Sequence, residues 1–83
     1  MALPQGGSTT RTDELSPREH VVLSLMAQGL TNVEIAETLH LAPSTVKAHT
    51  SSILLKLDVR NRTEAVLVSM GVAVQRRNDR PES

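Results

Sequence analysis

The chain contains three copies of a local pattern that marks the start of a helix. In each copy a Ser, Thr or Asn is followed three residues later by a Glu, just before an apolar run; the copies are Ser16-Pro-Arg-Glu19, Thr31-Asn-Val-Glu34 and Asn61-Arg-Thr-Glu64. The first side chain can accept a hydrogen bond from a free backbone N–H of the first turn, and the Glu can reach back to the N-cap N–H. The sequence therefore predicts helices that begin near residues 17, 32 and 62.

A further helix is predicted over residues 43–57. Pro43 suits the first helical position, because the N–H that proline lacks has no partner there. Val46, Ile53 and Leu57 recur on one stripe at helical spacing. Gly29 and Gly71 are placed to end the first and last helices. We therefore expect an all-α fold of four helices, over about 17–28, 32–39, 43–57 and 62–70.

Composition restricts the core and the chemistry. The 83 residues include no Phe, Tyr, Trp or Cys, so the core must be aliphatic, and neither a disulfide nor a cysteine-based zinc site can form. The three histidines (His20, His40 and His49) lack metal-pair spacing, and no nucleophile–base pair is evident. We expect neither enzymatic activity nor a metal or cofactor. With no apolar signal-peptide core or membrane-length run, we expect no membrane association and a cytoplasmic location, nucleoid-associated when bound to DNA.

The length fits one small domain with two tails. Residues 1–13 are rich in Gly, Ser and Thr, which is typical of a disordered tail or the end of an interdomain linker. Residues 14–74 carry the helical patterns, and Leu15 is expected to pack into the core together with Val22, Leu23, Met26 and Ala27. Residues 75–83 are predicted to form a second, frayed tail.

The stretch 43–57 has a distinctive surface pattern. It carries no acidic residue, Lys47 and Ser51 share one face, and another face is lined by Thr45, His49, Ser52 and Lys56. Residues 13–40 have a net charge of −4 and residues 43–62 of +3, although the whole chain is neutral. Such a basic, hydrogen-bonding helix after a short turn predicts a helix-turn-helix unit whose second helix lies against DNA. Because the net charge is zero, the electrostatic field around the whole chain is weak, and we expect only modest non-specific affinity for DNA.

These residues together resemble the LuxR/NarL-type (GerE-like) helix-turn-helix domain of bacterial transcription regulators. The resemblance covers about residues 15–70 and includes Leu15-Ser-Pro-Arg-Glu19, Val22-Leu23, Ala27, Gly29, Thr31-Asn32, Glu34-Ile-Ala36, Leu39, Ser44-Thr-Val-Lys47, His49, Ile53, Lys56-Leu57, Val59, Arg62 and Ala65. The chain departs from the family at Val33 and Leu55, where many members have polar or basic residues. Ser51 is shorter than the basic residue often found there, and Ala42 replaces the usual hydroxylic cap.

The resemblance implies a role for each of these positions. The third helix would enter the major groove, with base contacts from Lys47, Ala48 and Ser51. Phosphate contacts would come from Asn32, Ser44, Thr45, His49, Lys56 and Arg62. From the residues alone, His49 could instead bond a neighbouring carbonyl, and Lys56 could simply extend over Leu55 and Leu57.

The resemblance also bears on partners. Residues 65–68 are apolar all round, so this part of the fourth helix is either a dimer contact, implied for Leu67 and Val68, or a docking site for an upstream domain. Members of the family usually carry such a regulatory domain, for example that of a response regulator, which this chain lacks. The leading hypothesis is a homodimeric, sequence-specific output domain that binds double-stranded DNA. The alternative is a trihelical protein-interaction module that contacts RNA polymerase or a sigma factor through its acidic first two helices.

Overall fold

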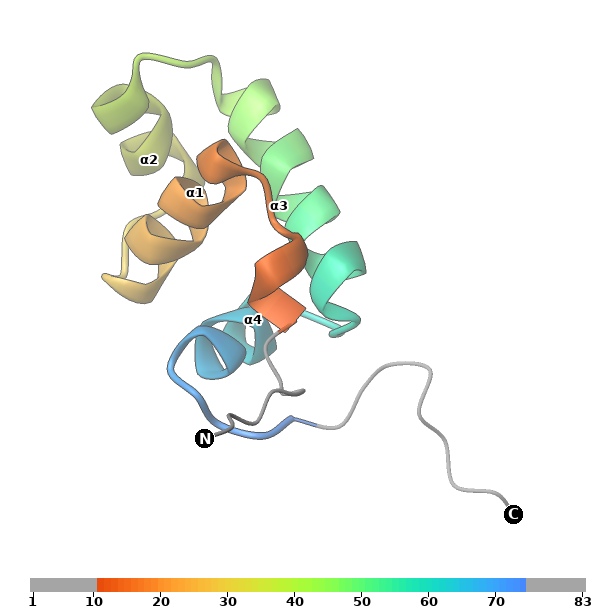
Figure 1. The fold of residues 1–83 in the computed structure, drawn as a ribbon. Helices are drawn as coiled ribbons and strands as arrows, with labels where there is room; N and C mark the ends of the chain where they lie inside the picture. Colours follow the sequence, from red (N-terminus) through yellow and green to blue (C-terminus); the bar gives the residue numbers. More distant parts are fainter. Residues whose placement is uncertain (1–10, 75–83) are drawn as a thin grey trace.

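The computed structural model describes residues 11–74. A short 3-10 helix, η2 (Arg11–Glu14), precedes four α-helices, which are α1 (Pro17–Ala27), α2 (Asn32–Leu39), α3 (Pro43–Leu57) and α4 (Arg62–Ser69). The described part contains no strand, so the expected all-α fold of four helices is confirmed (Figure 1). Helices α1 and α4 each end one residue earlier than predicted. Residues 11–13, assigned to the tail from the sequence, form η2 with Glu14, whereas residues 1–10 and the tail 75–83 lie outside the described residues.

The first two predicted capping boxes are present. The Ser16 hydroxyl accepts a 3.1 Å hydrogen bond from the Glu19 N–H, and the Glu19 carboxylate accepts one of 2.9 Å from the Ser16 N–H. Thr31 and Glu34 make the same reciprocal pair, at 3.1 and 2.8 Å. Each pair satisfies two backbone donors at a helix start. The local sequence alone therefore fixes where α1 and α2 begin.

The other two helix starts depart from that pattern. Asn61 caps α4 by accepting a 2.9 Å bond from the Glu64 N–H, but the Glu64 carboxylate accepts from the Arg60 N–H, not from Asn61. The third capping box is thus only half correct, because Glu64 also pairs with the Arg60 guanidinium at 3.3 Å and is held one residue upstream. Ala42 caps α3 without any side-chain hydrogen bond, as its methyl group requires. Such a cap costs on the order of 1 kcal/mol relative to Ser or Thr.

Left-handed residues end the two helices that flank the central turn. His40 after α2 and Asp58 after α3 both have φ of 60°. These reversals allow the Leu41 N–H to bond the Ala36 carbonyl at 2.9 Å and the Val59 N–H to bond the Leu54 carbonyl at 3.1 Å. Only residues 40–42 separate α2 from α3. The predicted helix-turn-helix connection is therefore present.

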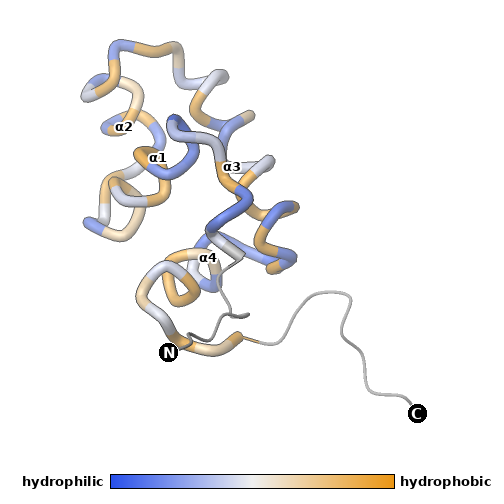
Figure 2. The backbone as a smooth tube through the Cα atoms, in the orientation of Figure 1, coloured by the Kyte–Doolittle hydropathy of each residue, from blue (hydrophilic) through white to orange (hydrophobic). Residues whose placement is uncertain are grey.

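Aliphatic side chains from all four α-helices meet in one core. Its buried members are Leu15, Val22, Leu23, Met26, Ile35, Ala36, Val46, Ile53, Leu57, Val59 and Ala65. Figure 2 shows apolar and polar residues mixed along α1, α2 and α3, as expected for short helices with one buried side, and a mainly apolar stretch in α4. Ala27 was expected in this core but is exposed. The buried stripe of α1 runs instead through Glu19, Val22, Leu23 and Met26, and Ala27 lies beside it.

Helix α3 lies at the centre of the arrangement. It packs against α1, α2, α4 and η2, so it is held along its length by the rest of the domain (Figure 1). Packing on the inner side leaves the opposite side of α3 facing outward. Among the described residues, no helix is long and apolar enough to cross a membrane.

Candidate nucleic-acid interface

The outward side of α3 carries the three predicted base-contact residues. Lys47, Ala48 and Ser51 are all exposed, and Ser44 and Leu55 are exposed on the same side of the helix. On the inner side, Val46, Ile53 and Leu57 have no accessible surface. The Lys47 side chain makes no hydrogen bond or ion pair with any described residue. We refer to Ser44, Lys47, Ala48, Ser51 and Leu55 as the outer face of α3.

Three of the predicted phosphate contacts lie on this face (Ser44) or beside it (Thr45 and His49). Ser44 and Thr45 are exposed in the first turn of α3, and His49 is half-buried one turn further along. Because Ala42 offers no side-chain cap, no side chain occupies the backbone N–H groups at this helix start. Pro43 has no N–H, and the N–H groups of Thr45 and Val46 bond the Ala42 carbonyl, so the Ser44 N–H and the positive end of the helix dipole are what favour an anion here. The residues around the start of α3 are thus suited to a negatively charged partner.

Lys56 has a partner inside the domain. Its Nζ lies 2.8 Å from Oε1 of Glu19, and the hydroxyl of Ser52 donates a 2.6 Å bond to Oε2 of the same carboxylate. Glu19 is only 5% exposed, whereas the Lys56 side chain is 39% exposed. These bonds join the start of α1 to the last turns of α3.

The surroundings of Glu19 keep it ionised. Burial by itself would raise the pKa of Glu19, but the hydrogen bonds from Lys56, Ser52 and the Ser16 N–H, with the charge of Lys56, together lower it to about 2. The positive charge of Lys56 is therefore balanced within the domain at neutral pH. Lys56 retains exposed surface, and its contact with a phosphate stays a prediction.

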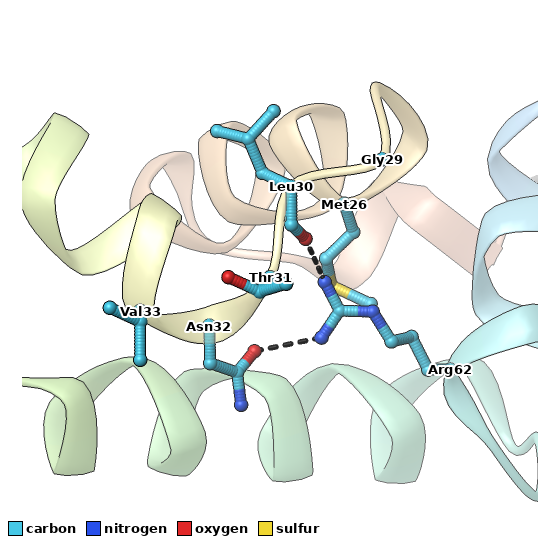
Figure 3. Close-up of a pocket in the computed structure, with 7 residues that line it drawn as sticks. All are labelled: Met26, Gly29, Leu30, Thr31, Asn32, Val33 and Arg62. Atoms are coloured by element: carbon cyan, nitrogen blue, oxygen red, sulfur yellow. Dashed lines mark hydrogen bonds between the residues drawn. The ribbon is translucent and has the colours of Figure 1, made fainter.

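Asn32 and Arg62, two further predicted phosphate contacts, are brought together. The Arg62 guanidinium donates a 2.8 Å bond to Oδ1 of Asn32 and a second bond to the Leu30 carbonyl (Figure 3). These bonds tie the start of α4 to the turn between α1 and α2, beside a shallow hollow. A guanidinium can only donate hydrogen bonds, so the Asn32 side chain turns its oxygen towards Arg62. The NH₂ group of Asn32 is thereby left available to donate to another partner. The pair therefore orders Asn32 without using its N–H groups.

Two of these structural contacts were not expected from the sequence. Glu19 was predicted only as a capping residue, although it lies three, four and seven residues before Val22, Leu23 and Met26 and so had to face the same core. No pattern in the sequence indicated that the Leu30 carbonyl would accept a hydrogen bond from Arg62. Within the described residues, no group of three or more His, Asp or Glu side chains is placed to hold a metal ion.

The apolar part of α4 packs partly against the core. Val66 and Val68 pack against the core from half-buried positions, and Val74 folds back onto the same core. Leu67 is also half-buried but is not part of that packing. Just beyond the helix, Met70 and Val72 are largely exposed. Of the two residues predicted to form a dimer contact, Val68 therefore packs partly against the core, whereas Leu67 does not.

Comparison with known proteins agrees with this geometry. The family model described as bacterial regulatory proteins, luxR family, matches residues 13–69. The transcriptional regulatory proteins ComA and LnrK of Bacillus subtilis are 42% identical over 66 residues and 48% identical over 63 residues, which cover 80% and 74% of this chain. The response regulator protein VraR of Staphylococcus aureus is 49% identical over 53 residues, or 64% of this chain. The matches span 31%, 29% and 25% of ComA, LnrK and VraR. The chain therefore belongs to the luxR family of bacterial regulatory proteins, and its four α-helices form the helix-turn-helix domain of that family.

Proposed function

We propose that this domain binds double-stranded DNA sequence-specifically, with α3 in the major groove, as the output domain of a transcription regulator. The observation that carries the proposal is the outer face of α3, where Lys47 is exposed and has no partner among the described residues. The helix contains no acid that would repel phosphates. The major groove is wide enough to admit an α-helix.

Each residue of this interface has a proposed role. Lys47 donates to guanine O6 and N7, Ser51 bonds a base edge, and Ala48 is small enough to let the helix approach closely. Phosphates are bound by Ser44, Thr45 and His49 and by the uncapped start of α3. Asn32, ordered by Arg62, and the exposed part of Lys56 add contacts at the edges of this surface. Phosphate contacts set the register, and base contacts supply the discrimination.

The wider role follows from the relatives. Two of them are named transcriptional regulatory proteins and one is named a response regulator protein, and this chain spans less than a third of each. We infer that the domain is the DNA-binding part of such a regulator, that it acts in the cytoplasm, and that an upstream domain receives the signal. The half-buried Leu67 and the exposed apolar side chains just after α4 support a homodimer on two half-sites, with Leu67 and Val68 at or beside the contact.

Replacing Lys47 by Ala tests the base-reading role. A DNA duplex that the unmodified chain binds is first selected from a random library. The affinities of each variant for this selected duplex and for a scrambled duplex are then measured by fluorescence anisotropy at one salt concentration. Lys47→Ala is expected to lower affinity for the selected duplex by about 1–3 kcal/mol and for the scrambled one by less. Arg18→Ala removes an exposed positive charge from α1 and serves as the matched control, with little expected effect on either duplex.

The outcomes separate the candidate functions. Equal loss of affinity by Lys47→Ala on both duplexes would show that Lys47 contacts phosphate instead of bases. If the unmodified chain bound neither duplex at low salt, DNA binding would be excluded. A module that contacts RNA polymerase or a sigma factor through the acidic surface of α1 and α2 would then be the better account.

A further inference from the structure

Leu55 is the one large apolar side chain of α3 that is exposed to solvent. It is 68% exposed, which is more than Val21, Val33, Met70 or Val72 on the other elements. Its backbone belongs to the ordered last turn of α3, since its carbonyl accepts a 3.1 Å bond from the Asp58 N–H. The Leu55 side chain is thus exposed to water on an ordered helix, and its exposure costs the free energy that burial of its apolar surface would provide.

The position of Leu55 continues the outer face of α3. Leu55 follows Ser51 by four residues and Ala48 by seven, so the three lie in one line along the helix. With a rise of about 1.5 Å per residue, Leu55 lies about 6 Å beyond Ser51 and about 12 Å beyond Lys47 along the axis. A helix that lies along the major groove advances by about one base for every three to four residues, so Leu55 lies roughly one base pair beyond Ser51 and roughly two to three beyond Lys47.

The surroundings of Leu55 favour a small apolar partner over a protein surface. Its neighbours on the outer face are Ser44, Lys47, Ala48 and Ser51, which offer little apolar area. A stable protein–protein contact would need a far larger continuous patch. In the major groove, by contrast, the C5-methyl group of thymine is a single apolar feature that aliphatic side chains recognise.

We propose that Leu55 contacts a thymine methyl group, so that this domain prefers sites in which a thymine lies roughly two to three base pairs from the guanine bound by Lys47. The inference rests on the proposed function and specifies its sequence preference. Ala48, in line with Leu55 and also apolar, can contact a second methyl group nearer to Lys47.

Replacement of thymine by deoxyuridine tests this contact directly, because it removes the methyl group and leaves the hydrogen-bonding edge unchanged. The 83-residue chain is titrated with its library-selected duplex and with duplexes carrying one deoxyuridine at each thymine in turn. One substitution in the predicted region is expected to weaken binding about three- to fivefold, as burial of one methyl group implies. Leu55→Ala is expected to bind the original duplex more weakly by a similar factor and to lose the preference for thymine at that position.

Val33→Ala is the matched control, because Val33 is an exposed aliphatic residue of α2 outside this face. It should keep the full preference for thymine, and circular dichroism melting should show that both variants are folded. Unchanged affinity for every deoxyuridine duplex would overturn the inference while leaving DNA binding intact. So would a preference for thymine that persists in Leu55→Ala, or a Leu55→Ala variant that changes only self-association in sedimentation. Absence of selective binding to any duplex would overturn the inference and the proposed function together.

Discussion

Glu19 links the start of α1 to the body of α3 through both oxygens of its carboxylate. Oε1 accepts from the Ser16 N–H and from Lys56, and Oε2 accepts from Ser52. A carboxylate that is 5% exposed is stable in the ionised form only when such donors surround it. The orientation of α3, and with it the direction of its outer face, therefore depends partly on this residue.

The low pKa of Glu19 predicts an acid-dependent loss of stability. The folded-state pKa of about 2 lies below the ordinary value of 4.5, so the stabilisation is complete above about pH 4.5 and is lost as the pH falls towards 2. A difference of this size corresponds to about 3 kcal/mol. Glu19→Gln should lower the free energy of unfolding by about that amount at pH 7, and the gap from the unmodified chain should narrow below pH 4.5.

Urea denaturation at a series of pH values measures this gap. Glu37→Gln, which alters an exposed acid of α2, is the control and should follow the unmodified chain throughout. A gap between Glu19→Gln and the unmodified chain that stays constant from pH 7 to pH 2 would contradict a stabilising role for the ionised carboxylate.

For individual residues, the sequence predicted correctly which side chains lie near the candidate interface. It did not predict the hydrogen-bond partners of these side chains. Lys47, Ala48 and Ser51 were expected on one exposed side of a helix, and they lie there because 3.6-residue periodicity places them opposite the core. The bonds of Lys56 and of Asn32 with Arg62 join residues about 30 or more positions apart in the chain. Such contacts depend on how the helices cross, which no local pattern specifies.

Among the elements, the four helices were predictable because their start signals are local. Capping and proline rules act within a few residues, so α2 and α3 have the predicted bounds. The covered side of α4 was not predictable, since the apolar run 65–68 has no single stripe from which it could be read. In the structure Ala65 is fully buried, Val66 and Val68 pack beside it, and Leu67 stays outside this packing.

This arrangement predicts that Leu67 contributes to dimer formation without being needed for folding. On a duplex with two half-sites, the unmodified chain should bind cooperatively with two copies per duplex. Leu67→Ser should reduce that cooperativity by about tenfold, because the half-buried leucine has only part of its surface left to bury, which contributes about 0.7 kcal/mol from each of the two copies. Affinity for a single half-site should be unchanged.

Anisotropy titrations with one-site and two-site duplexes, and sedimentation of the complexes, provide the measurement. Val21→Ser alters a similarly apolar but more exposed position on α1 and should leave cooperativity intact. Cooperative binding by Leu67→Ser equal to that of the unmodified chain would remove α4 from the dimer contact.

Across the whole molecule, charge is separated although its sum is zero. Acidic residues predominate over positions 13–40 and basic residues over 43–62, and α3 is held from within by every other helix. The packing thus turns the acid-free outer face of α3 away from the core. A neutral total charge limits long-range attraction to DNA, so the proposed function relies on short-range contacts made by this face.

The measurement that tests this account most directly is amide chemical-shift mapping of the 83-residue chain during titration with its selected duplex. The account predicts that the largest changes fall on residues 43–56 of α3 and on Asn32, with smaller changes on the exposed positions of α1. Changes concentrated on α1 or α4, with Lys47, Ala48 and Ser51 unaffected at saturation, would contradict it.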